Sequence, residues 1–454
     1  MSRIPQAEVM SKNPSPTTKV HIRSSFRDAV YTSLNIGMAE SYFCPFLLAL
    51  GVPSITAGLG VILAQFIGAC FQLIFIRFFF HQYSLKKRLL IFLGVQAFSL
   101  IPLIWSGVLK VSYPPLLIGI LGLYWGCLLT LNPPWNKLMG HTVPTRFRMN
   151  FFATRNQFAQ VSVLIGLILS GFFLSRVAGK QAELTVFVLI FCVGFVLKCL
   201  SWMEVRNFHQ DYEPRHEHQP QLGVREFVKR LKGSEQGRLI FFLFFFFIAV
   251  HSASPYFTPF MLNRLKFTYL EFMVIVGLSF TGRIICLKIL QRWVKSRQIN
   301  GVLIISAIGI STSPLLWTFS QHYGWIMLVE FLSGCYWAGF ELSTTLIYYK
   351  KIEDHERTRV MSYISFFNIS GMAIGSLMGA ALMHFLPATV DQYLVLFSVA
   401  TFLRIAVIIF LPHVDLKGEL PHILSFSLRP PFAAISRPIF GMFEKKNSED
   451  KKEK

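Results

Sequence analysis

Long apolar stretches follow one another along almost the entire chain, and no other feature constrains its fold as strongly. The stretches 239–250 and 393–412 contain almost no charged residue, and hydrophobic residues make up 53% of the chain against 15% charged residues. A soluble domain carries about 25% charged residues. Because a chain in lipid must satisfy its backbone hydrogen bonds internally, these stretches predict an all-α membrane protein.

Each apolar stretch is about 20 residues long, which is the length of helix that crosses a bilayer. Twelve transmembrane helices are predicted, at 28–50, 54–77, 88–108, 114–136, 153–175, 183–203, 239–262, 268–290, 300–319, 323–347, 360–386 and 391–412. They divide the chain into a cytoplasmic N-terminal tail (1–27), a six-helix bundle (28–203), a cytoplasmic linker with an amphipathic helix (204–238), a second six-helix bundle (239–412) and a cytoplasmic C-terminal tail (413–454).

Basic residues are concentrated on one side of the predicted membrane. The chain carries 44 Lys and Arg residues against 23 Asp and Glu residues. With the N-terminus inside, 36 basic residues fall on the inner side and five on the outer side. Because cytoplasmic loops collect Lys and Arg, the split predicts a multi-pass protein of the cytoplasmic (inner) membrane with both termini in the cytoplasm. The same rule accounts for the net charge of +21, so nucleic acid is not an expected partner.

The two halves of the chain share a sequence repeat. SYFCPFLL at 41–48 and PYFTPFML at 255–262 are identical at five of eight positions, at an offset of 214. Collinear matches follow at similar offsets, such as SLIPLIW at 99–105 with STSPLLW at 311–317. Two copies with an even number of helices share one orientation in the membrane, which predicts a pseudo-twofold axis along the membrane normal.

Two parallel six-helix halves joined by a polar cytoplasmic linker resemble the major facilitator superfamily. The resemblance covers about residues 26–412 and is strongest at 132–156, where the chain is similar to an uncharacterised bacterial subgroup. The matching positions are Asn132, Pro133, Trp135, Gly140, Val143, Pro144, Arg146, Arg148, Arg155 and Asn156. His141 and Met149 depart from that pattern, and the loop at 77–88 lacks the Gly and Asp of the superfamily's helix 2–3 motif.

The resemblance implies secondary active transport of a small solute by alternating access, coupled to a proton or another ion, as a symporter or an antiporter. It also implies cytoplasmic gating loops, whose candidate residues are Arg146, Arg148, Arg155, Arg357 and Arg359. Two other classes stay open. Phe-rich helices could line the apolar pathway of a lipid or amphiphile translocase, although such side chains more often face acyl chains. A non-transporting receptor is supported only by the incomplete 77–88 motif.

Motifs of enzymes and pumps are missing from the sequence. It has no nucleotide-binding glycine loop, no HExxH and no GxSxG. We therefore expect neither an enzyme nor a pump driven by ATP, and we predict no cofactor and no metal site. The expected partners are a small-molecule substrate, a coupling proton or cation and the lipid bilayer, and the expected state is a monomer.

Glu40 is the main candidate for substrate or proton coupling. An ionisable residue deep in a span costs at least about 2.5–3.5 kcal/mol on insertion scales, so its position calls for an explanation. Glu40 lies about midway along 28–50, beside a stripe of residues at helical spacing that includes Asn35. The stripe should face a central cavity or a neighbouring helix. A functional carboxylate and a carboxylate hydrogen-bonded to a neighbouring helix are equally compatible with this position.

His251 lies at a similar depth in the second half and is a second candidate. A histidine within a span is most often a hydrogen-bonding group between helices. Its place on the helix related to 28–50 by the repeat also allows a role as a coupling site, because histidine titrates near neutral pH. An acid at Glu40 and a base at His251 would then face each other across the pseudo-twofold axis.

Charged and polar residues of other spans complete the candidate set. Glu330 and Glu341 share one face of their helix because eleven residues make about three turns. Arg283 lies at the depth of Glu341, and the two are predicted to pair, either as a structural ion pair or as part of an ionic substrate site. Substrate contacts are predicted on helices that line the cavity in the resembled fold, at Gln65, Trp125, Gln157 and Asn368. Lys198 and Arg404, at repeated positions, are predicted to anchor their helices at the headgroups.

Overall fold

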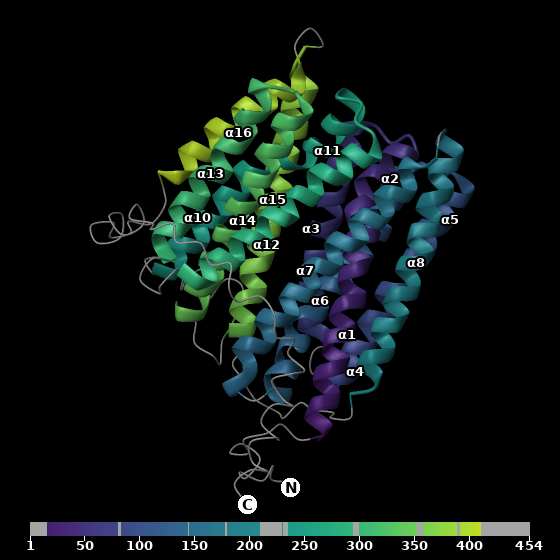
Figure 1. Cartoon of the computed structure of the whole chain (residues 1–454), viewed down its shortest axis with the longest axis vertical. Coiled ribbons are helices and arrows are strands. Elements are labelled where there is room, and N and C mark those ends of the chain that lie inside the picture. The colour runs from purple at the N-terminus through teal and green to yellow at the C-terminus, as the bar shows by residue number, and fades with distance from the viewer. Residues whose placement is uncertain are drawn as a thin grey trace, which may run out of the picture. The chain divides into compact units, whose positions relative to one another are not determined.

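The chain forms a bundle of helices in this computed structural model, which describes residues 16–79, 83–143, 145–177, 179–208, 229, 235–293, 299–351, 357–387 and 391–409. Within these ranges every regular element is helical (Figure 1). Nine of the described helical segments are long and apolar enough to cross a membrane. They run over 54–75, 85–109, 114–132, 154–175, 181–206, 237–264, 269–290, 299–319 and 363–385. The chain is therefore a multi-pass α-helical membrane protein.

The remaining three predicted spans are helical too, although they do not meet the same criteria of length and composition. Residues 28–50 are divided among α1 (Pro16–Met38), the short η2 (Glu40–Tyr42) and α2 (Phe43–Ala49). Residues 323–347 lie within α14 (Tyr323–Lys351), and the last span corresponds to α16 (Gln392–Ile408). The first helix thus begins twelve residues before the predicted boundary.

The other helices of the first half overlap the predicted spans, although the fourth ends six residues later and the fifth begins eight residues earlier than predicted. They are α3 (Ser54–Phe79), α4 (Leu85–Phe98), α5 (Leu100–Leu109), α6 (Pro114–Thr142), α7 (Thr145–Ser175) and α8 (Lys180–Arg206). The second half contains α10 (Glu235–His251), η3 (Ser254–Tyr256), α11 (Phe257–Pro259), η4 (Phe260–Arg264), α12 (Tyr269–Trp293), α13 (Ile299–Phe319) and α15 (Arg357–Phe385).

A break in the first helix of each half follows the sequence repeat. The short segments 40–42 and 254–256 are 3₁₀ turns, and their separation equals the repeat offset of 214. Each break lies just before a repeated proline, Pro45 or Pro259, and both prolines are buried. Proline has no N–H and clashes with the carbonyl four residues earlier, so it disfavours a continuous α-helix through this point. The break is the same local response to the same sequence in both halves.

Helix contacts also come in matched pairs. The contact of α1 with α7 corresponds to that of α10 with α15, and the contact of α3 with α6 corresponds to that of α12 with α14. Glycines permit the closest approaches, since a Cβ on Gly37 would overlap the carbonyl of Val163, and a Cβ on Gly375 would overlap the carbonyl of Ile248. Small residues at such points allow helix backbones to meet in a membrane.

The two halves contact each other through α7 with α12 and through α3 with α15. At one end, the Asn263 amide donates a 2.5 Å hydrogen bond to the Ser54 hydroxyl. Nearby, a Cβ on Gly58 would lie 2.6 Å from the carbonyl oxygen of Pro255, so these backbones also lie close together. Toward the opposite ends of the helices the side chain of Gln157 on α7 is exposed, and that of Glu341 on α14 is half exposed.

Candidate functional site

Glu40 lies in a hydrogen-bonded group at the break between α1 and α2. The carboxylate of Glu40 accepts a short hydrogen bond from the Tyr124 hydroxyl of α6. The same hydroxyl accepts a 2.7 Å hydrogen bond from the Asn35 amide of α1. Asn35 and Tyr124 are both fully buried. The predicted candidates Glu40 and Asn35 are therefore joined through Tyr124, which the sequence analysis did not single out.

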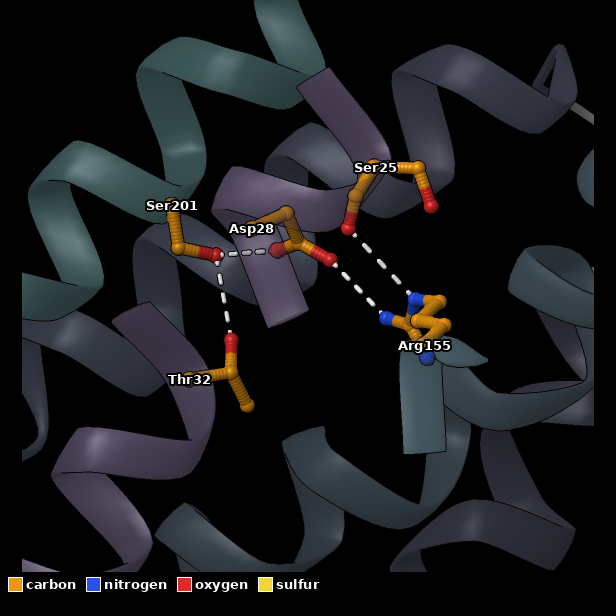
Figure 2. Close-up of polar contacts among 5 residues, drawn as sticks. All are labelled: Ser25, Asp28, Thr32, Arg155 and Ser201. Carbon is orange, nitrogen blue, oxygen red and sulfur yellow. Dashed lines mark hydrogen bonds and ion pairs between the residues drawn. The ribbon is translucent and has the colours of Figure 1, made fainter. Parts of the chain in front are cut away.

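A second polar group lies about halfway along α1 (Pro16–Met38), and Figure 2 shows its members around the Asp28 carboxylate. One oxygen of Asp28 accepts a 2.6 Å hydrogen bond from Ser201 on α8, and the other accepts one of 3.2 Å from Arg155 on α7. Arg155 also donates to the backbone carbonyl of Ser25, and Thr32 lies 3.3 Å from the Ser201 hydroxyl. The group joins three helices of the first half.

These contacts decide the direction of the predicted stripe on the first helix, whose polar members are Asp28, Thr32, Asn35 and Tyr42. Asp28 and Thr32 meet α8, Asn35 meets α6, and Tyr42 donates a 2.9 Å hydrogen bond to the carbonyl of Leu167 on α7. The stripe therefore faces neighbouring helices of its own half. Of the two predicted environments, a cavity or a neighbouring helix, the structure shows the second.

Lys198 lies between the two polar groups, and its predicted role as a headgroup anchor is wrong. The side chain is completely buried, and its ammonium group stands 5.7 Å from the centre of the Tyr124 ring. It interacts electrostatically with both Glu40 and Asp28. The anchor prediction failed because α8 continues to Arg206, about 12 Å beyond Lys198, so the headgroups are out of reach.

Arg404, at the repeated position on α16, is buried as well, and its predicted anchor role is also wrong. Its guanidinium donates hydrogen bonds to the backbone carbonyls of Ala249, Val250 and Ile310 at 3.4, 2.7 and 2.9 Å. Two of these carbonyls lie where the break after α10 interrupts the helix ladder. Ile310 precedes Pro314 by four residues, so its carbonyl has no intrahelical N–H partner. Arg404 therefore donates to carbonyls at helix irregularities, and those of Ala249 and Val250 also accept hydrogen bonds from the hydroxyls of Ser252 and Ser254.

His251 ends α10, and its contacts lie within the second half. Its ring lies 6.0 Å from that of Phe247, and its backbone carbonyl accepts a 3.3 Å hydrogen bond from Ser376 on α15. Glu40 makes its side-chain contacts in the first half, with α6 and α8. No contact between Glu40 and His251 exists among the described side chains, so the structure does not bring the two candidates together.

The predicted pair of Arg283 and Glu341 is confirmed. A guanidinium nitrogen of Arg283 on α12 lies 3.3 Å from a carboxylate oxygen of Glu341 on α14. The Glu341 side chain is half exposed, so its carboxylate is accessible as well as paired. Glu330, on the same helix, instead interacts with the side chains of Ser279 and Trp317 inside the second half.

The other candidates occupy different surroundings. Gln157 is exposed on α7, whereas Gln65 on α3 is half-buried. The indole N–H of Trp125 and the amide oxygen of Asn368 are buried and have no hydrogen-bond partner among the described residues. Such unpaired buried polar atoms are uncommon. These four side chains remain candidates for substrate contact.

Among the predicted gating residues, the structure describes only the side chain of Arg155. It pairs with Asp28 and stacks over Trp135, with the guanidinium 4.9 Å from the ring centre. The backbone positions of Arg146 and Arg148 lie at the start of α7, and those of Arg357 and Arg359 at the start of α15. Their side chains lie outside the described part of the chain, as does most of the linker 204–238, including most of its predicted amphipathic helix.

The sequence profile of the Major Facilitator Superfamily matches residues 32–376. This match spans most of the chain, so the chain belongs to that superfamily of membrane transporters. It is therefore a transporter and not an enzyme. A search of curated proteins found no match to the chain.

Solved structures of superfamily transporters share the fold at low sequence identity. The bacterial homologue of the iron transporter ferroportin, in its inward-facing state, superposes with a TM-score of 0.64 at 14% identity and covers 86% of this chain and 97% of its own. The D-xylose-proton symporter superposes with a TM-score of 0.64 at 10% identity, and the match covers 88% of this chain and 98% of the symporter. A variant of the nucleoside transporter NupG superposes with a TM-score of 0.63 at 12% identity, and the match covers 86% of this chain and 99% of NupG. Because these neighbours transport different solutes, the likeness extends to the fold and does not identify the substrate.

Proposed function

We propose that this chain is a secondary active transporter that moves a small solute across the cytoplasmic membrane by alternating access, with protons coupled through Glu40. Twelve spans in two six-helix halves, with both termini in the cytoplasm, form the proposed architecture. The matched helix contacts and the repeated break at 40–42 and 254–256 support the two halves. The distribution of basic residues supports the orientation.

Contacts between the halves support alternating access. The hydrogen bond of Ser54 with Asn263 and the close approach of Gly58 to Pro255 lie at the end that this orientation places outside. Gln157 and Glu341 are exposed toward the other end. Contact between the halves at the outer end is what one of the two states of the mechanism requires, and a ligand or proton that binds the states unequally would shift the balance.

The observation that carries the proposal is the buried group around Glu40. A carboxylate within a span is costly and calls for a compensating role. Glu40 has a hydroxyl donor in Tyr124 and a cation in Lys198 nearby, so both its charged and its protonated forms have interactions. It also lies at the break in the first helix, where a change in hydrogen bonding acts on the joint between α1 and α2.

The test begins with the substrate, which a thermal-shift screen of small solutes on the purified protein would find, since a ligand that binds only the folded state raises its melting temperature. Uptake is then measured in proteoliposomes with an imposed pH gradient. Glu40→Gln should lose accumulation driven by the gradient but keep exchange of solute across the membrane. Glu204→Gln, a matched carboxylate at the end of α8, should behave as the wild type.

Two outcomes would contradict the proposal. Accumulation that follows the pH gradient fully in Glu40→Gln would reduce Glu40 to a structural group. Flux of a fluorescent lipid in place of any soluble solute would identify a lipid translocase, and no flux of either kind would favour a receptor.

A further inference from the structure

Lys198 is the one fully buried ammonium group among the described residues, and it has no hydrogen-bond partner there. Burying an unpaired charge costs several kcal/mol. The compensation must come from charges and π-electrons nearby. Lys198 has three sources of it: the ring face of Tyr124, the carboxylate of Glu40 and the carboxylate of Asp28.

The two carboxylates are not equivalent as partners. Asp28 already has a hydrogen-bonded guanidinium in Arg155 and a hydroxyl donor in Ser201. Glu40 has only the Tyr124 hydroxyl as a hydrogen-bond donor. The four charged groups balance as two acids and two bases, and pairing Arg155 with Asp28 leaves Lys198 for Glu40. Tyr124 connects these two, since its hydroxyl contacts the carboxylate while its ring faces the ammonium.

The packing of α1 against α8 places Lys198 within reach of both acids. Gly194 lies against Asn35, because a Cβ there would be 2.6 Å from the Asn35 amide oxygen. Ser201 lies against Asp28 and Thr32. Lys198 is midway between Gly194 and Ser201 on α8, and so lies between the level of Asn35 and that of Asp28.

The repeat supplies an independent comparison. At the offset of 214, the position that holds Glu40 in the first half holds Ser254 in the second. The cation equivalent to Lys198 is Arg404, and it is satisfied entirely by backbone carbonyls. The first half has an acid at the helix break and a lysine with no carbonyl partner. The second half lacks that acid, and its arginine is bonded to carbonyls and needs no carboxylate partner.

We propose that Lys198 is the counter-cation of the Glu40 carboxylate, and that proton binding to Glu40 releases Lys198 toward Asp28. One proton moves from water to a Glu40 oxygen, and Lys198 keeps its own proton throughout. The inference rests on the proposed coupling role of Glu40 and adds a positioning residue on α8. Transfer of the cation between acids at two levels of α1 would link the charge of Glu40 to the contact of α1 with α8.

Other groups that face this set are few. Cys127 on α6 interacts electrostatically with Lys198, and Arg155 on α7 faces Asp28. Among the described residues, α2, α4 and α5 contribute no titratable side chain that interacts electrostatically with Lys198. The neutral thiol of Cys127 cannot balance an ammonium, so Glu40 and Asp28 are the counter-charges of Lys198 within the described part of the chain.

Infrared spectroscopy of the purified protein in lipid nanodiscs tests the pairing directly, with protons as the probe. A protonated carboxyl group has a C=O band that disappears on deprotonation, and the band of Glu40 is identified by its loss in Glu40→Gln. In Lys198→Met the band should persist to a pH at least about one unit higher, which corresponds to a tenfold change in proton affinity. Arg404→Met, the matched control, should leave the titration of the band unchanged.

Thermal unfolding of the same proteins covers the case in which Lys198→Met folds poorly. Lys198→Met and Glu40→Gln each leave one uncompensated charge, so each should lower the melting temperature. The double variant removes both charges and should melt above Lys198→Met, whereas Arg404→Met combined with Glu40→Gln should show additive losses. An unchanged infrared titration in Lys198→Met, or additive losses in the Lys198 and Glu40 pair, would overturn the inference. Neither measurement involves a transported solute, so each can fail or succeed independently of the uptake assay.

Discussion

Removal of Arg155 is expected to destabilise the protein through the acid that it leaves behind. Asp28 is 8% exposed and Arg155 is 17% exposed, and their side chains lie 3.2 Å apart. In Arg155→Met the carboxylate keeps only the hydroxyl of Ser201 as a donor. Breaking a buried pair by removing one partner costs about 3–5 kcal/mol, because the remaining charge loses its hydrogen-bonded counter-charge.

Related variants are expected to lower the free energy of unfolding by different amounts, because they remove different interactions of different exposure. Ser201→Ala removes one hydrogen bond to a charged group and should cost about 1.5–3 kcal/mol. Asp28→Asn combined with Arg155→Met removes both charges, and should therefore recover part of the loss of Arg155→Met. Arg27→Met is the matched control, because Arg27 of α1 also forms an ion pair with a neighbouring helix, through Glu204 of α8, but is 65% exposed. It should cost no more than about 1 kcal/mol.

The measurement is the free energy of unfolding of each purified variant in mixed micelles with increasing denaturing detergent. The reasoning is refuted if Arg155→Met costs no more than Arg27→Met, or if the effects of Asp28→Asn and Arg155→Met simply add. Additivity would mean that the two side chains do not share a single interaction.

Three further outcomes are expected. Gly37→Val should abolish folded protein on size-exclusion chromatography because its side chain would enter the α7 backbone, whereas Gly119→Val, with open space around its Cβ, should fold; equal yields would contradict the close packing of α1 with α7. Cysteines placed in the linker 204–238 should react with an impermeant maleimide only after cells are opened, and labelling of intact cells would reverse the proposed orientation. Ser54→Cys with Asn263→Cys should form a disulfide on mild oxidation when this end is closed, at a yield that falls when a transported solute favours the opposite state, and a constant yield would argue against movement between the halves.

The fold was largely predictable from the sequence because its main determinants are local. Apolar length predicted the spans, whereas the breaks before the repeated Pro45 and Pro259 in the first helix of each half were not predicted. The pair of Arg283 and Glu341 was also predictable, since helix periodicity and depth restrict which charges can meet. The start of α1 at Pro16 was not, because a polar helix that extends beyond the membrane has no hydropathy signal.

The candidate site was only partly predictable because depth along a helix does not specify direction around it. Depth identified Glu40, and helical spacing identified the stripe that contains Asn35, but neither showed that Tyr124 joins them. Lys198 was misassigned for the same reason. A lysine inside a span can either extend to the headgroups or turn inward to an acid, and only the position of α8 against α1 decides between these directions.

Lys198 and Arg404 show that the residue type at a repeated position carries information about the partner of a buried basic side chain. Both are buried cations at the same position of the repeat, yet one faces carboxylates and the other faces carbonyls. Pro314 leaves the carbonyl of Ile310 unpaired, and the multiple donors of arginine suit several backbone oxygens at once. A single point charge suits the first half under the proposed function, in which the acid at position 40 gains and loses a proton. On that proposal the residue type at the repeated position follows its partner, with lysine beside a carboxylate that titrates and arginine beside backbone carbonyls that do not.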